Sequence, residues 1–279
     1  EFDSLFAHQI MELNKINSLV ELFFKKYKEK NFSLNKPFLK WLKDEKNDFL
    51  NWSDVGNRIQ TLSEYLRKNL HPGDRCVLLS ENRPEWLITD IAIMNAGGVT
   101  VPLFTTYSEK DYEYIIHDCK PKMCVVSNKT QFEKLEKFVS NDTKILSIEK
   151  FSEKIESIES ILDEFLSKEV NSISEDYNKK INRKDLACII YTSGTTGNPK
   201  GVMLSHGGIL SNCEGALEIL DTITKDVKNE GPTFLTWLPL SHSYEHTVQF
   251  IQITLGAKVY YAESLEKLLS NMSIAKPTI

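Results

Sequence analysis

Hydrophobic and polar residues form two recurring patterns along the chain, and together these patterns predict a sheet with helices packed on it. Short apolar runs have the length of buried strands, and they span residues 76–79, 99–104, 123–126, 144–148, 186–191, 202–204, 234–238 and 259–261. Apolar residues at three- or four-residue spacing predict helices over residues 18–30, 53–66, 84–96, 108–119, 130–139, 155–165, 207–220 and 243–255. Strands that alternate with helices are typical of crossover units on a largely parallel sheet. The predicted fold class is therefore α/β, with layered α/β/α subdomains.

Residues that favour helix ends mark several of these boundaries. Ser53 is the expected N-cap of the second helix, because its hydroxyl can accept a backbone hydrogen bond. Residues 108–111 fit a capping box. Pro84 suits the first turn of a helix, and the glycine pair at 97–98 would end it.

The polarity of the chain divides it into three parts. Residues 18–150 are expected to form a first α/β subdomain and residues 186–279 a second one. Residues 151–185 are rich in Glu, Lys, Ser and Asn, which indicates a helix followed by a polar surface linker. The chain starts at Glu1 rather than Met, and a new strand is expected to begin at 276–279, so we expect a truncated domain.

Composition narrows the class of protein. Hydrophobic residues make up 41% of the chain and charged residues 26%, as in a globular protein. The net charge is −5 and no basic stripe stands out, so nothing indicates a nucleic-acid partner. The five cysteines are scattered, which favours a reducing compartment over disulfides. No apolar run approaches the roughly 20 residues of a membrane span. We expect a cytoplasmic protein, and peripheral contact with a membrane stays open.

Residues 191–201 hold the strongest functional signal. They place four Ser or Thr hydroxyls, three glycines and Lys200 between two predicted strands. Glycines let a backbone approach a ligand closely, successive N–H groups can bind an anion, and Lys200 adds a mobile charge. The pattern therefore predicts a polyphosphate-binding loop. It is not a Walker loop, since Pro199 stands where that motif has its second glycine, and it is not G-x-G-x-x-G.

The run from Tyr191 to His206 closely resembles the phosphate loop of the adenylate-forming superfamily, which includes acyl-CoA synthetases, luciferases and peptide-synthetase adenylation domains. A second run, from Leu238 to His246, resembles a loop and helix start of long-chain acyl-CoA synthetases. Weaker matches extend the resemblance from about residue 18 to the end of the chain, and they lie at residues 51–66, 94–103 and 262–279.

The resemblance implies a candidate site. His242 would lie beside the acyl and adenylate groups, so His242 and Lys200 are the catalytic candidates, and no residue of this chain is assigned to a metal. Relatives often carry Arg after the glutamate of the second run, whereas this chain has His246. The residues implied to bind the nucleotide are Thr192, Ser193, Gly194, Thr195, Thr196, Gly197, Lys200 and Glu245.

The resemblance also implies an activity. A long-chain fatty acid would react with ATP and Mg²⁺ to form an acyl-adenylate, and coenzyme A would then accept the acyl group. Residues 1–279 would be an incomplete N-terminal AMP-binding domain, because the adenine, ribose and Mg²⁺ ligands and the C-terminal lid of the family come later in the chain. We therefore expect this chain alone to bind ATP weakly and to lack ligase activity.

Four other interpretations stay open. The protein could be another adenylating member, such as an acyl-AMP ligase, or a non-catalytic nucleotide-binding scaffold. Residues 242–246 also spell H-x-x-E-H, an inverted zinc-protease signature, although no third ligand offers itself. A further alternative is that His242 and Glu245 only cap a helix and bond locally.

Overall fold

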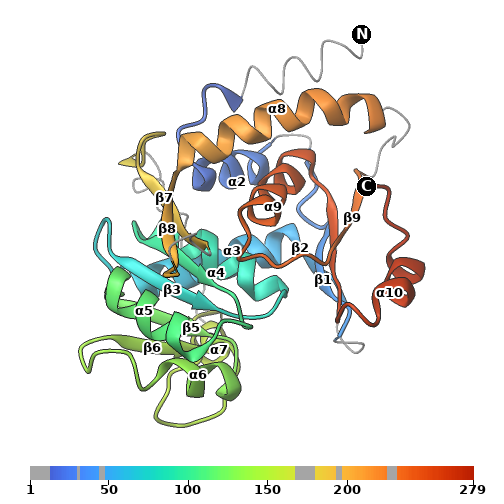
Figure 1. The fold of residues 1–279 in the computed structure, drawn as a ribbon. Coiled ribbons are helices and arrows are strands. Elements are labelled where there is room, and N and C mark those ends of the chain that lie inside the picture. Colours follow the sequence, from blue (N-terminus) through green and yellow to red (C-terminus); the bar gives the residue numbers. More distant parts are fainter. Residues whose placement is uncertain (1–12, 30–31, 44–47, 167–179, 193–196, 225–230) are drawn as a thin grey trace.

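The computed structural model describes residues 13–29, 32–43, 48–166, 180–192, 197–224 and 231–279. Two sheets organise this part of the chain (Figure 1). The larger sheet contains, in spatial order, β6 (Lys144–Ser147), β5 (Met123–Val126), β3 (Arg75–Leu79), β4 (Val99–Leu103), β7 (Leu186–Thr192) and β8 (Lys200–Ser205). The smaller sheet contains β2 (Leu50–Asn51), β1 (Pro37–Trp41), β10 (Lys258–Tyr261) and β9 (Thr233–Thr236). All neighbouring strands run parallel except the pairs β7–β8 and β1–β2.

Helices cover both faces of the larger sheet, and this confirms the α/β prediction. Alternate strand residues point to opposite faces. Val77 and Val101 belong to an apolar cluster with α5, whereas Cys76 and Leu78 belong to the main core with α3 and α4. The helices are α2 (Leu19–Tyr27), α3 (Trp52–Leu66), α4 (Pro84–Asn95), α5 (Glu109–Cys119), α6 (Lys129–Leu135), α7 (Ile158–Leu166), α8 (His206–Thr224), α9 (Ser243–Leu255) and α10 (Leu268–Ala275).

Helix α4 is buried on all sides because it packs against strands of both sheets. Its apolar residues are therefore not confined to one stripe, as they would be on a surface helix. Pro84 occupies the first turn, as predicted, and Gly97, with a φ of 89°, follows the end of the helix. An acidic residue, Asp90, lies in this apolar helix with no exposed surface.

The two sheets do not follow the division predicted from the sequence. Strands β7 and β8 come from the second predicted part but complete the larger sheet, and β1 comes from the first part but pairs with β10. Strands β1 and β2 were not predicted from the sequence, because a five-residue strand that begins with proline and a two-residue strand give no clear apolar run. The boundaries at 151–185 therefore do not describe how the strands pair.

Two helix boundaries tested the capping predictions. Ser108 and Asp111 form the predicted capping box at the start of α5, with both reciprocal hydrogen bonds present. The prediction of Ser53 as an N-cap was wrong, because Asn51 caps α3 and shares a capping box with Asp54. Helix α6 ends at Leu135, earlier than the predicted residue 139.

The last residues of the chain follow the edge of the smaller sheet without forming the predicted strand. The backbone N–H of Thr278 donates to the carbonyl of Thr233, at 2.9 Å, and its hydroxyl oxygen accepts from the N–H of Thr233, also at 2.9 Å. All five cysteines are free and buried. Within the described part of the chain, no helix combines the length and the apolarity needed to cross a bilayer.

Candidate functional site

The predicted phosphate loop connects the antiparallel strands β7 and β8. Strand β7 is anchored by buried residues such as Cys188 and Ile190. At its end, Thr192 lies opposite Lys200 in the ladder, and both side chains are exposed. Four of the predicted nucleotide-binding residues lie outside the described residues, namely Ser193, Gly194, Thr195 and Thr196. The hairpin therefore presents a hydroxyl and an ammonium group side by side where the loop begins and ends.

Gly197 gives the returning end of this loop a special backbone conformation. Its φ is 95°, in the region that side-chain-bearing residues rarely adopt. Among the described residues, no heavy atom lies within 4 Å of the position that a Cβ of residue 197 would take. The exposed hydroxyl of Thr192 and the exposed ammonium group of Lys200 suit a ligand with many acceptor oxygens, such as a polyphosphate.

Tyr191 fixes the base of the hairpin. Its hydroxyl donates to Oδ2 of Asp118 at 2.5 Å, and its carbonyl accepts from the hydroxyl of Tyr107 at 2.7 Å. Burial raises the pKa of Tyr107 to about 12, so this phenol remains a donor at neutral pH. Tyr107 follows β4, and its hydrogen bond therefore connects the loop after β4 to the phosphate hairpin.

The second predicted segment, residues 238–246, joins β9 to α9 and is held by several long-range hydrogen bonds. The side-chain amide of Asn82 donates to the carbonyl of Leu238 at 2.6 Å, and its oxygen accepts from the N–H of Leu240 at 3.1 Å. The buried Ser241 hydroxyl donates to the carbonyl of Leu103, the last residue of β4, at 2.8 Å. Both candidate segments are thus tied to the carboxyl end of β4, the edge where ligands of α/β sheets bind.

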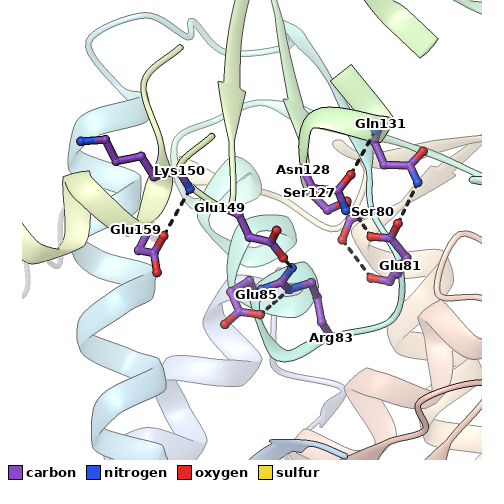
Figure 2. A network of polar contacts seen from close by, with 10 residues as sticks. All are labelled: Ser80, Glu81, Arg83, Glu85, Ser127, Asn128, Gln131, Glu149, Lys150 and Glu159. Atoms are coloured by element: carbon purple, nitrogen blue, oxygen red, sulfur yellow. Dashed lines mark hydrogen bonds and ion pairs between the residues drawn. The ribbon is translucent and has the colours of Figure 1, made fainter. Parts of the chain in front are cut away.

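Glu81, the residue before Asn82, belongs to a polar network that Figure 2 shows. Glu81 accepts hydrogen bonds from Ser127 at 2.6 Å and from Gln131 at 2.7 Å. Burial opposes the ionisation of Glu81, but these hydrogen bonds outweigh it and lower the pKa of the carboxyl.

Arg83 anchors the other side of Asn82. Its guanidinium donates to Glu85 at 2.7 Å and to Glu149 at 2.5 Å (Figure 2). It also lies over the ring of Trp41, 4.5 Å from the centroid. Because the residues on either side of Asn82 are fixed in this way, the loop presents Asn82 in one orientation to the segment that precedes α9.

His242 stands at the entrance of α9, as the sequence predicted. It is the N-cap residue, and its Nδ1 accepts from the backbone N–H of Tyr244 at 3.2 Å. The side chain is exposed. Since Nδ1 serves the cap, a ligand at this site would meet Nε2.

Glu245 lies in the first turn of α9, but its side chain is only 5% exposed. Burial raises the pKa of this carboxyl to about 7, and a hydrogen bond with Thr236 opposes part of that rise. A nucleotide would therefore meet Glu245 only through the small exposed part of its side chain.

His246 is committed to protein contacts. Its Nε2 lies 2.7 Å from Oδ2 of Asp90, and its Nδ1 lies 3.6 Å from Sγ of Cys188. With His242 engaged as the cap, the two histidines of the H-x-x-E-H pattern serve different neighbours. No cluster of three or more His, Cys, Asp or Glu able to hold a metal occurs among the described residues. Sequence reasoning missed Asp90, although a charged residue inside an apolar helix was a visible signal.

Solved structures share this fold. A long-chain-fatty-acid-CoA ligase from Archaeoglobus fulgidus matches with a TM-score of 0.75 and 23% identity, over 94% of this chain and 50% of that chain. VinN in complex with L-aspartate matches with a TM-score of 0.74 and 18% identity, over 94% of this chain and 62% of that chain. The fold is that of the N-terminal domain of adenylate-forming enzymes.

The sequence then gives the family. The family model described as AMP-binding enzyme matches residues 27–279, so the chain belongs to this family, as its phosphate-loop resemblance predicted. Long-chain-fatty-acid–CoA ligase 5 of Mus musculus is 30% identical over 248 residues, which cover 83% of this chain and 36% of that protein. Fatty acyl-CoA synthetase A of Dictyostelium discoideum is 27% identical over 227 residues, which cover 77% of this chain and 33% of that protein. The chain spans about a third of the length of these relatives.

Proposed function

We propose that the complete protein containing this chain is a ligase that activates a long-chain fatty acid with ATP and transfers the acyl group to coenzyme A. The observation that carries this proposal is the pairing of Thr192 with Lys200 at a hairpin tied to the same strand end as the His242 segment. The names of the relatives support the acyl class, because they are long-chain-fatty-acid–CoA ligases and a fatty acyl-CoA synthetase. A cytoplasmic location is part of the proposal.

The site chemistry suits the first half-reaction. A carboxylate and ATP are both anions, so the enzyme has to offset negative charge where they meet. Lys200 and the hydroxyl of Thr192 would hold phosphate oxygens, and the loop amides would add donors. His242 would orient the reacting groups through Nε2, because its Nδ1 is bound to the helix backbone.

The hydrogen-bond donors at the hairpin suit the phosphates of ATP better than they suit a metal ion bound by protein side chains alone. The exposed groups at the hairpin are donors, and the described residues include no cluster of metal ligands. Mg²⁺ would therefore arrive on the phosphate oxygens of ATP, where it offsets charge. Thr192, Gly197 and Lys200 would bind the phosphates around it.

The test is a fatty-acid-dependent assay of the complete protein, with AMP, pyrophosphate and acyl-CoA measured with and without coenzyme A. Formation of AMP and a CoA thioester supports the proposal, and the fatty-acid chain length with the highest kcat/KM defines the substrate. AMP formation without a thioester would assign another adenylating enzyme, such as an acyl-AMP ligase. If no fatty acid supports pyrophosphate release, a nucleotide-binding scaffold becomes the better explanation. Residues 1–279 alone are expected to form no acyl-CoA.

A further inference from the structure

A buried contact joins three elements that flank the candidate site. His246 on α9 has no exposed surface, and its Nε2 lies 2.7 Å from Oδ2 of Asp90 on α4, which is equally buried. The other ring nitrogen lies 3.6 Å from Sγ of Cys188 on β7. One side chain therefore contacts both the helix that follows the Asn82 loop and the strand that leads into the phosphate loop.

Burying these polar groups costs desolvation free energy, which indicates that the contact does more than stabilise the fold. The rings of Trp86 and Phe250 lie 5.4 and 5.5 Å from the imidazole centroid, so the surroundings are largely apolar. Within the described residues, Oδ1 of Asp90 has no hydrogen-bond partner. Buried pairs with an incomplete hydrogen-bond set are often no more stabilising than apolar residues of similar volume. A directional hydrogen bond in this apolar environment is better explained by the position in which it holds α9 relative to α4.

The residues of this contact are close in sequence to the candidate site residues. His246 lies one helical turn after His242, and its backbone N–H donates to the carbonyl of His242 at 2.9 Å. Cys188 lies four residues before Thr192 on β7, which is about 13 Å along the strand. A shift of the His246 ring would therefore move the first turn of α9 relative to β7.

We propose that His246 and Asp90 are positioning residues that hold the first turn of α9, with His242 and Glu245, against α4 and β7 in the geometry required for adenylation. The inference rests on the proposed function. Neither residue contacts a substrate, and both act through the place they give to His242 and Glu245. Small displacements of positioned groups can cost about a hundredfold in rate.

The charge state of the ring agrees with this role. Burial disfavours the imidazolium, but the charge of Asp90 and its hydrogen bond outweigh burial and raise the pKa of His246. A proton on Nε2 lets this nitrogen donate to Oδ2 of Asp90, whereas the donor and acceptor roles of Nδ1 and Sγ of Cys188 depend on the ring tautomer. Charge-assisted hydrogen bonds have a strong directional preference, which suits a positioning contact.

The experiment compares His246→Leu with His246→Gln in the complete protein, by fatty-acid-dependent ATP–pyrophosphate exchange below the melting temperature of both variants. Glutamine keeps an N–H donor for Asp90 and leucine does not. We expect His246→Leu to lower kcat about 10- to 100-fold while the KM for ATP changes less than about threefold, and His246→Gln to recover most of that loss. If both variants keep the wild-type kcat, or if both lose it equally, the inference is overturned.

Two further measurements keep the inference testable. Ser63→Ala removes another buried hydrogen bond of α4, from Asn95 to Ser63 at 2.9 Å, and should lower the melting temperature without changing kcat. If His246→Leu does not fold, Asp90→Ala, which removes the acceptor of the His246 hydrogen bond, replaces it with the same expectation. Hydrogen exchange of residues 238–246 should accelerate in the Leu or Ala variant, and unchanged exchange would contradict the inference. An inactive wild type would instead remove the proposed function, and hydrogen exchange would still test the contact itself.

Discussion

The two segments that meet at the carboxyl end of β4 are held in opposite ways. The phosphate hairpin presents Thr192 and Lys200 to solvent, whereas residues 238–246 are bound by Asn82, by the carbonyl of Leu103 and by Asp90. The difference fits two roles. A segment that binds a ligand keeps its hydrogen-bond donors exposed, and a segment that orients the reacting groups is held in place by contacts with the rest of the protein. Substitutions in the first should therefore affect ligand binding and catalysis, and substitutions in the second should affect stability as well.

Lys200→Ala should give the largest effect. We expect kcat/KM for ATP to fall about 100- to 1,000-fold, because the variant loses a charged donor to the phosphates. The melting temperature should stay within about 1 °C of the wild type, since the side chain is exposed and surface substitutions have little effect on stability. Lys122→Ala, at another exposed lysine, is the matched control. Wild-type kinetics in Lys200→Ala would remove the hairpin from the site.

Glu245 should make stability depend on pH. Its carboxyl has a pKa of about 7 in the folded state, above its ordinary value, because it is buried. The folded state thus holds this proton more tightly, so the contribution of Glu245 to stability is fully present below about pH 4.5 and is lost as the pH rises through about 7, by up to about 3 kcal/mol.

Denaturant unfolding at a series of pH values tests this expectation. Glu245→Gln should unfold with a flatter pH dependence between pH 4.5 and 7 than the wild type. Glu113→Gln, at an exposed glutamate of α5, should leave the wild-type profile unchanged. Identical profiles for Glu245→Gln and the wild type would show that Glu245 is solvated in solution.

The hairpin and the 238–246 segment also differ in how far the sequence could predict them. The phosphate loop was visible as a local pattern, since glycines, hydroxyls and Lys200 are close in sequence. The contacts that hold 238–246 were not, because Asn82 and Asp90 lie more than 150 residues away and only the fold brings them near. The same reason explains the missed strand β1, whose partner β10 lies about 220 residues later. Periodicity predicts elements, whereas pairing between distant elements depends on the whole core.

His242 permits a test that separates catalysis from capping. His242→Ala should lower stability by about 1 kcal/mol, because α9 loses its N-cap hydrogen bond. His242→Asn should restore stability, since asparagine is a strong N-cap residue. If the imidazole also takes part in the reaction, both variants should lose about tenfold or more in kcat. Wild-type activity in His242→Asn would mean that His242 acts only as a cap.

Among these variants, Gly197→Ala should have the smallest kinetic effect, and that effect should appear in the KM for ATP. Its positive φ costs a side-chain-bearing residue about 1–2 kcal/mol, and none of the described residues lies within 4 Å of the new methyl group. Gly73→Ala is a matched control, because Gly73 has a φ of 85° and equally open surroundings, but precedes β3 at the opposite edge of the sheet. Both variants should therefore lose similar stability, and only Gly197→Ala should raise the KM for ATP, by several-fold. An equal KM for ATP in the two variants would show that the backbone conformation of Gly197 does not affect phosphate binding.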